Sequence, residues 1–164
     1  MMKLDEPNPL NDVADFHEIF EMPVQEHPII PNEKRCELRV NLLSEELDEL
    51  REAIEDKDLV EIADALCDIQ YVLSGAILEF GLGKSFKRLF EEVQRSNMSK
   101  VCHSEEEAIA TQEFYRQKDG TTSIVEKRDG EYLVYRANDR KVLKSINYSP
   151  ADLTSILEEY LVKT

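Results

Sequence analysis

The sequence predicts a mainly α-helical protein that carries a small β-rich segment after its helical part. Two stretches, residues 33–55 and 59–80, place apolar side chains at steps of three and four, which is the spacing of one buried helix face. Beyond residue 120, residues alternate in type around Asp129-Gly130, a dipeptide typical of a type I′ β-hairpin. The predicted fold is therefore a helical bundle followed by a small C-terminal β-meander and a final helix.

Capping residues and turn signals set the elements in chain order. Gly81 is expected to stop the second long helix, because glycine tolerates the left-handed backbone at a helix end. Glu61 lies three residues after a capping residue, so a capping box is one interpretation of its position. The expected helix caps are Asn11, Asn32, Asp58, Ser104 and Ser149. The expected helices span 11–22, 33–55, 59–80, 85–96, 104–117 and a final stretch from 150, and the expected strands span 121–127, 131–137 and 141–146.

Length and charge limit the classes of protein. A chain of 164 residues fits one domain with an appendage, and we predict a helical domain over residues 1–117 and an appendage over 118–164. With 35 acidic and 20 basic residues the net charge is −15, which argues against nucleic-acid and anionic-membrane partners. The three cysteines form no C-x-x-C pair, so structural disulfides are not expected and a cytoplasmic location fits.

Acidic residues gather in both long helices within apolar surroundings. The clustered acids are Glu45, Glu46 and Glu49 in the first long helix and Glu61, Asp64 and Asp68 in the second. Residues three or four apart share a helix face, so like charges repel there unless a positive charge lies between them. The second helix has no basic residue to pair with its acids, and we expect both its apolar and its acidic stripe to be partly buried. Two antiparallel helices would bring Glu46, Glu49, Glu61 and Asp64 together, and such carboxylates suit Mg²⁺ or Mn²⁺.

These acids carry a resemblance to a known superfamily. Glu45-Glu46-x-x-Glu49, then eleven residues, then Glu61-x-x-Asp64 resembles the MazG-like all-α nucleoside triphosphate pyrophosphohydrolases, which include dimeric dUTPases and phosphoribosyl-ATP pyrophosphohydrolases. The surrounding Ala63-Asp64-Ala65-Leu66 and Tyr71-Val72-x-x-Gly75 are also similar, and the resemblance covers roughly residues 12–101. It implies that Glu46, Glu49, Glu61 and Asp64 hold Mg²⁺.

A second motif lies at the end of the helix expected over residues 85–96. The stretch Arg95-Ser96-Asn97-Met98-Ser99-Lys100 resembles a segment that binds the sugar and phosphates of the substrate in these enzymes. The resemblance implies substrate-binding roles for Asn97 and Lys100, and also for Arg95. The alternative is a basic helix end that interacts favourably with the helix dipole.

The resemblance implies a Mg²⁺-dependent hydrolase that converts a (deoxy)nucleoside triphosphate, such as dUTP, into a monophosphate and pyrophosphate. In this interpretation Glu46 acts at the catalytic centre as a metal ligand, and Glu45 accepts the proton of the attacking water. Asp68, one turn beyond Asp64, is a further ligand or an acceptor that orients the ligands. Because the family pairs its chains, a homodimer or a dimer of dimers is expected.

Several side chains outside these motifs have open interpretations. Phe16 and Phe20 either pack in the core or form a wall that stacks on a nucleotide base. His17, which lies between them, is expected at the surface or as a capping residue. Arg35 and Arg39 are expected to be solvated, unless one of them approaches a substrate phosphate.

Three other functions compete with nucleotide hydrolysis of this kind. Phosphoribosyl-ATP hydrolysis is a related activity, but nothing in the sequence marks a site for the extra ribose phosphate. A non-catalytic acidic helical interaction module is the alternative from a different class. A carboxylate-bridged di-iron centre needs Glu-x-x-His on two helices, and it is excluded because none of the three histidines follows a glutamate by three residues.

Overall fold

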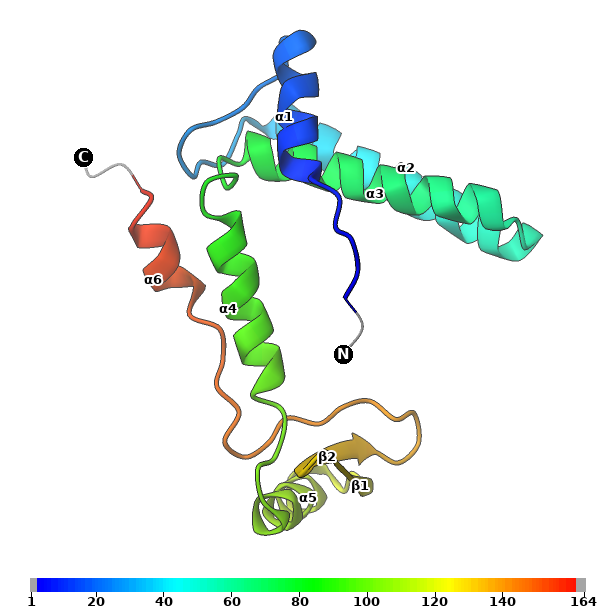
Figure 1. Ribbon diagram of the computed structural model, residues 1–164, viewed down its shortest axis with the longest axis vertical. Coiled ribbons are helices and arrows are strands. Elements are labelled where there is room, and N and C mark those ends of the chain that lie inside the picture. The colour runs from blue at the N-terminus through cyan, green and yellow to red at the C-terminus, as the bar shows by residue number, and fades with distance from the viewer. Residues whose placement is uncertain (1–2, 162–164) are drawn as a thin grey trace. The chain divides into compact units, whose positions relative to one another are not determined.

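The computed structural model describes residues 3–161 and confirms a mainly α-helical fold with a C-terminal hairpin and helix (Figure 1). Within this range the chain forms two compact units, one from the described parts of residues 1–87 and 157–164 and one from residues 88–156. The predicted division into domains 1–117 and 118–164 stays a prediction. The elements are α1 (Pro9–Ile19), α2 (Glu33–Asp56), α3 (Leu59–Glu79), α4 (Phe86–Met98), α5 (Glu105–Asp119), β1 (Ser123–Arg128), β2 (Glu131–Arg136) and α6 (Leu153–Glu158).

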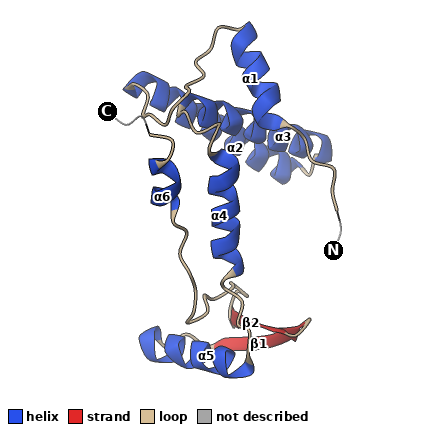
Figure 2. Ribbon diagram, turned by 60° about the vertical axis from the view of Figure 1, so that its left-hand side comes forward, coloured by secondary structure: helices blue, strands red, loops and turns tan. Residues whose placement is uncertain are grey.

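The first unit is built on α2 and α3, which run side by side as an antiparallel pair, with α1 packed on α3 (Figures 1 and 2). The predicted caps of both long helices are confirmed. The Asn32 side chain accepts a hydrogen bond from the Arg35 backbone N–H, and Asp58 accepts from Val60 and Glu61. These caps fix where each helix begins and therefore which acids face each other.

Gly81 follows the end of α3, as predicted, and its backbone has a φ of +69°. A Cβ atom at this position would lie 1.8 Å from the carbonyl oxygen of His27, so a side chain has no room. The close approach also lets Ile29 N–H donate to the Phe80 carbonyl at 3.0 Å, which binds the connector between α1 and α2 to the end of α3.

The start of α1 differs from the prediction. The helix begins at Pro9 rather than after Asn11, because proline has a helical φ and needs no hydrogen bond for a backbone N–H at the first position. The Asn11 side chain lies within the helix and donates to Oδ1 of Asn8 at 2.6 Å. The predicted cap at Asn11 is therefore wrong.

A buried polar cluster joins the three helices of the first unit, which the sequence did not predict. Glu79 of α3 is 1% exposed and accepts hydrogen bonds from Arg35 and Arg39 of α2. His17 of α1 is also 1% exposed and contacts Arg39. The expected surface position of His17 and the solvated position of Arg39 are both wrong, because a buried carboxylate on α3 requires cationic partners. Arg35 is partly buried and is also paired with Glu79.

Gly75 makes this cluster sterically possible. A Cβ atom on Gly75 would lie 2.6 Å from Nη1 of Arg39 and 3.1 Å from Nε2 of His17. Glycine here leaves space for two large polar side chains against the backbone of α3.

In the second unit α5 packs on the β1–β2 hairpin, with Cys102, Ala108, Val134 and Leu143 in the core (Figure 2). Positive φ values at Asp129 (52°) and Gly130 (88°) confirm the predicted tight turn.

The last part of the second unit departs from two predictions. A third strand does not form over residues 141–146, where one isolated bridge pairs Val142 with Tyr135. The final helix begins at Leu153 and is capped by Asp152, whose Oδ1 accepts from Ser155 N–H at 3.1 Å, rather than by Ser149. Among the described residues, no helix combines the length and apolar character needed to cross a membrane.

Candidate metal and nucleotide site

The acidic site lies between α2 and α3, and Glu46 is its central residue. The Glu46 side chain is half-buried. Burial raises the pKa of this carboxyl, and the charges of Asp68, Glu49, Glu45 and Asp64 raise it further. The antiparallel arrangement thus brings acids from both helices into one electrostatic cluster.

One oxygen of this carboxylate has no partner. Glu46 Oε2 is buried and forms no hydrogen bond with any described residue. An unsatisfied buried acceptor costs about 1–3 kcal/mol, and more when it is charged. A cation near these carboxylates would supply the missing contact of Glu46 and reduce the repulsion between the acids, and oxygen donors of this kind suit a divalent metal ion.

The remaining acids are placed unevenly around Glu46. Glu45, Glu49 and Asp64 are exposed, and Asp68 is half-buried. After burial, Asp68 has the largest effect on the pKa of Glu46, although the sequence pattern gave Asp68 only an accessory role.

Glu61 lies at the start of α3, where its backbone N–H donates to Asp58, and its side chain is exposed. Glu61 is not among the charges that raise the pKa of Glu46. The charges of Glu49 and Asp64 therefore act on Glu46, whereas Glu61 lies outside this electrostatic cluster, and the predicted set of four metal ligands stays a prediction.

The carboxylates do not form a closed cage in the single chain. Within residues 3–161, no group of three or more acidic, histidine or cysteine side chains lies close enough to hold a metal ion. The expectation that both stripes of α3 are partly buried along their length is also wrong for this chain. Asp64 and Tyr71 are exposed, as are the apolar Leu59 and Leu66.

An aromatic cluster lies on the same stripe of α3, one turn beyond Asp68. The ring of Tyr71 meets the ring of Phe16 edge-on, with centroids 5.6 Å apart. Phe16 in turn lies 4.3 Å from Phe20, which is 61% exposed. The aromatic pair on α1 therefore extends from α3 to solvent rather than lying wholly in the core. The spacing of three residues from Asp68 to Tyr71 is the sequence signal that relates this cluster to the acids.

The three residues predicted to bind substrate lie at the end of α4 and just beyond it. Lys100 Nζ donates to Asn97 Oδ1 at 2.7 Å, so these two side chains lie together. Arg95 is held by Glu92 through two hydrogen bonds of 2.7 Å, and it also donates to Ser149 Oγ at 3.0 Å. The Arg95 guanidinium lowers the pKa of Glu92 to about 2. Arg95 thus already connects α4 to the segment before α6.

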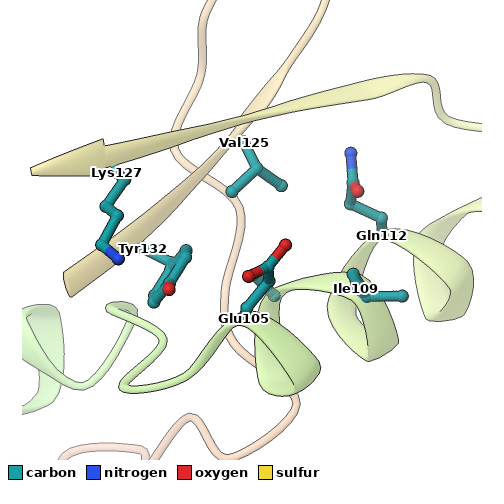
Figure 3. Close-up of a pocket in the computed structure, with 7 residues that line it drawn as sticks. Glu105, Ile109, Gln112, Val125, Lys127 and Tyr132 are labelled. Carbon is teal, nitrogen blue, oxygen red and sulfur yellow. The ribbon is translucent and has the colours of Figure 1, made fainter. Parts of the chain in front are cut away.

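A cavity of about 380 Å³ lies in the second unit, between α5 and the hairpin (Figure 3). Glu105 and Gln112 enter it from α5, and Lys127 and Tyr132 from the strands. The Lys127 ammonium lies 5.1 Å from the centroid of the Tyr132 ring, so the cavity is partly filled by a cation–π contact. The sequence patterns had indicated no chemistry in this region.

The antiparallel α2–α3 pair with its facing carboxylates defines the class of protein, an all-α pyrophosphohydrolase of the MazG-like superfamily. More closely, the family model described as phosphoribosyl-ATP pyrophosphohydrolase matches residues 13–97, which is more than half of the chain. The chain belongs to this family. The matched range contains all six clustered acids as well as Arg95 and Asn97 and ends before Lys100.

A viral protein is similar over most of the chain. An uncharacterized protein of Acanthamoeba polyphaga mimivirus is 24% identical over 236 aligned positions, which cover 89% of this chain and 94% of that protein. Because the alignment is longer than this chain, the viral protein carries additional residues between the matched segments.

Proposed function

We propose that this pyrophosphohydrolase acts on a nucleoside triphosphate in a Mg²⁺-dependent reaction that releases pyrophosphate and a monophosphate. The observation that carries the proposal is the buried, unpartnered Oε2 of Glu46 among four other carboxylates. Burial and the neighbouring charges raise the pKa of Glu46, so positive charge placed among these acids would favour its ionised form. Oxygen donors favour Mg²⁺, and Mn²⁺ is the alternative with similar preferences.

The chain's own residues divide the work of such a reaction. Glu46, Glu49 and Asp64, with Glu61 at the start of α3, would hold the metal, which when bound neutralises phosphate charge and makes water more acidic. Asp68 would orient the ligands from its half-buried position. Glu45 is exposed on the same turn as Glu46 and would accept the proton of the attacking water.

The aromatic cluster is the proposed contact for the base. Phe20 presents an exposed ring that rests on Phe16, and Phe16 rests on Tyr71 one turn beyond the acids. A base stacked on Phe20 needs no hydrogen-bonding partner, so this contact favours no particular base. Asn97 and Lys100 are the proposed contacts for sugar and phosphate, with Arg95 as a further candidate whose present hydrogen bonds hold it in place.

A homodimer is part of the proposal. The two long helices leave large apolar side chains more than half exposed, which is costly in water and is typical of a covered interface. These side chains are Leu47, Ile54, Leu59, Val60 and Leu66. A second copy that covers them would complete a bundle around the acids, and a dimer of dimers is the larger alternative.

Phosphoribosyl-ATP is the second candidate substrate. The description of the matching family favours it, whereas the exposed aromatic wall suits any nucleotide. A dUTP-like deoxynucleotide remains the first choice because nothing in the sequence marks a site for the extra ribose phosphate of phosphoribosyl-ATP.

The experiment is a hydrolysis assay on a panel of nucleoside triphosphates and phosphoribosyl-ATP, with Mg²⁺, with Mn²⁺ and with EDTA. Pyrophosphate release should need the metal and should fall at least about a hundredfold in Glu46→Gln and Asp64→Asn. The matched control is Glu37→Gln, which removes one exposed charge from the same helix and should leave the rate within about twofold. Absence of hydrolysis for every substrate, with a normally folded protein, would instead favour the non-catalytic interaction module.

A further inference from the structure

The second unit gathers cations around one cavity although the whole chain is strongly acidic. The cavity has a volume of about 270 Å³. Its charged lining consists of four cations, Lys100, Arg136, Lys141 and Lys144, and one carboxylate, Asp119. In a chain with a net charge of −15, this is a local positive field that attracts anions.

The backbone fixes the two lysines at positions 141 and 144. The Lys141 carbonyl accepts from Arg136 N–H at 2.9 Å, and Leu143 N–H donates to the Val134 carbonyl at 2.8 Å. Leu143 is buried in the core, so the segment cannot rotate freely. Lys141 and Lys144 therefore lie at fixed points beside β2.

Two tyrosines, Tyr115 and Tyr148, contact Lys144 at one end of the cavity. The Lys144 backbone N–H donates to the Tyr115 hydroxyl at 3.3 Å, and its ammonium lies 4.1 Å from the centroid of the Tyr148 ring. The pKa of Tyr148 is lowered first by its hydrogen bond with Ser96 and then by the charges of Lys144 and Lys100. The ammonium groups of Lys100 and Lys144 thus both lie near enough to act on the Tyr148 hydroxyl.

Most of the positive charge has no matching carboxylate. Arg136 is paired with Asp139, where Nε donates at 2.8 Å, and Asp119 accepts from Thr121 N–H at 3.1 Å. Within residues 3–161, the ammonium groups of Lys100, Lys141 and Lys144 form no ion pair. Three such groups around one cavity are the donors that a phosphoryl anion requires.

We propose that this basic cavity of the second unit binds a phosphoryl anion the size of a diphosphate. Lys100 is shared with the proposed substrate contacts, and the other cations of the cavity, Arg136, Lys141 and Lys144, have no role in the proposed reaction. The volume is below the range of about 300–1,000 Å³ typical of small-molecule pockets, so the cavity suits a phosphate or diphosphate group rather than a whole nucleotide. The source is either free pyrophosphate or the phosphate end of a sugar phosphate whose sugar stays outside. Neither source needs a metal ion, because the cations belong to the chain.

Calorimetric titration in EDTA at low ionic strength tests the proposal, with pyrophosphate in one arm and ribose 5-phosphate in the other. EDTA removes the metal through which the acidic cluster would hold phosphate, so failure of the proposed hydrolysis does not affect the result. We expect saturable binding of at least one anion to the full-length wild type, and the tighter arm identifies the source. The double variant Lys141→Gln/Lys144→Gln should weaken this binding at least about tenfold, since it removes two of the three ammonium groups that form no ion pair around the cavity.

Lys118→Gln is the matched control, because it removes a cation from the same unit that does not line the cavity. It should bind within about twofold of wild type. Equal weakening in the control and the double variant, or no saturable binding by wild type, would overturn the proposal. If the double variant does not fold, amide shift changes in wild type decide instead: they should lie at residues 100, 115, 136 and 141–144, and changes confined elsewhere contradict the site.

Discussion

The Nη2 atom of Arg39 lies 3.2 Å from Nε2 of His17 inside the first unit. The other ring nitrogen, Nδ1, lies 2.9 Å from the carbonyl oxygen of Pro23, which only accepts. Nδ1 therefore carries the proton, and Nε2 accepts from the guanidinium. Burial lowers the pKa of His17 from its ordinary value of 6.5, and the charge of Arg39 lowers it further against the Pro23 contact. A neutral imidazole is thus built into the fold.

This neutral histidine predicts a loss of stability in mild acid. The unfolded chain binds a proton at His17 near pH 6.5, whereas the folded chain binds it only at lower pH. The contribution is fully present above pH 6.5 and is lost as pH falls through that value, with a slope of up to about 1.4 kcal/mol per pH unit. Urea unfolding between pH 7.5 and about pH 5 measures it. His17→Gln should flatten the dependence, and His27→Gln, at an exposed position, should retain it; identical curves for all three proteins would contradict the assignment.

Glu79→Gln predicts a large loss of stability at neutral pH. Burial raises the pKa of Glu79, but hydrogen bonds and charges from Arg35 and Arg39 outweigh burial and lower it, so the carboxylate is ionised. A neutral amide leaves Arg39 buried without its counterion, and breaking a buried pair costs about 3–5 kcal/mol. The control Glu26→Gln breaks an ion pair in which the Glu26 side chain is 78% exposed and should cost less than about 1 kcal/mol. Similar costs for both variants would argue against the buried pair.

Gly75→Ala tests steric contact against helix propensity, which predict opposite signs. Propensity alone predicts a gain of about 0.5–1 kcal/mol, because alanine is the better helix former. The added methyl group would lie 2.6 Å from Nη1 of Arg39, so we expect a loss of about 1–3 kcal/mol instead. Ala63→Gly, at an exposed position of the same helix, calibrates the propensity effect. A Gly75→Ala protein that melts above wild type would show that the cluster has room to relax.

The acidic site predicts opposite effects of Glu46→Gln with and without metal. The pKa of Glu46 is raised, so its ionisation destabilises the metal-free fold as pH rises above the ordinary value of 4.5. The variant should therefore melt higher than wild type in EDTA at pH 7. Mg²⁺ should stabilise wild type by about 2.7 kcal/mol at a concentration of a hundred times Kd, and the variant by much less. Glu37→Gln should respond to Mg²⁺ as wild type does, and a wild type whose melting temperature ignores Mg²⁺ and Mn²⁺ would contradict the metal site.

The aromatic wall predicts a binding defect without a folding defect. Because Phe20 is 61% exposed, Phe20→Ala should cost less than about 1 kcal/mol of stability. Loss of one base–aromatic contact of about 1–3 kcal/mol should raise KM about tenfold while kcat stays within about twofold. Ile19→Ala, at a neighbouring position that is 75% exposed, should leave KM unchanged. Equal KM values for wild type and Phe20→Ala would show that the substrate base does not stack on Phe20.

The sequence predicted best where one local rule decided the structure. The caps at Asn32 and Asp58, the stop at Gly81 and the turn at Asp129-Gly130 depend on a few neighbouring residues and are all confirmed. The metal-ligand set of Glu46, Glu49, Glu61 and Asp64 stays a prediction, and the charges of Asp64 and Asp68 from the second long helix act on Glu46.

Predictions that depended on distant partners were less accurate. Arg39 and His17 look like surface residues until Glu79, 40 residues beyond Arg39, is placed beside them. The third strand near Val142 was wrong because alternation of residue types does not specify whether a neighbouring edge is available beyond one bridge. Asp68 raises the pKa of Glu46 and Glu61 does not, because the two acids lie at different distances along α3 from Glu46. Sequence spacing alone does not give these distances.

Through His17, helix α1 contacts Arg39, which is paired with Glu79, the buried carboxylate that ties α2 to α3. Phe16 directly precedes His17, and its ring supports the exposed ring of Phe20. The contact between His17 and Arg39 therefore fixes where these two rings lie along α3. A variant that changes the strength of the proposed base contact therefore has freedom at position 20 but little at position 17. The exposed ring can be exchanged without disturbing the buried contacts, whereas a change at His17 would disturb the packing of the whole helix α1.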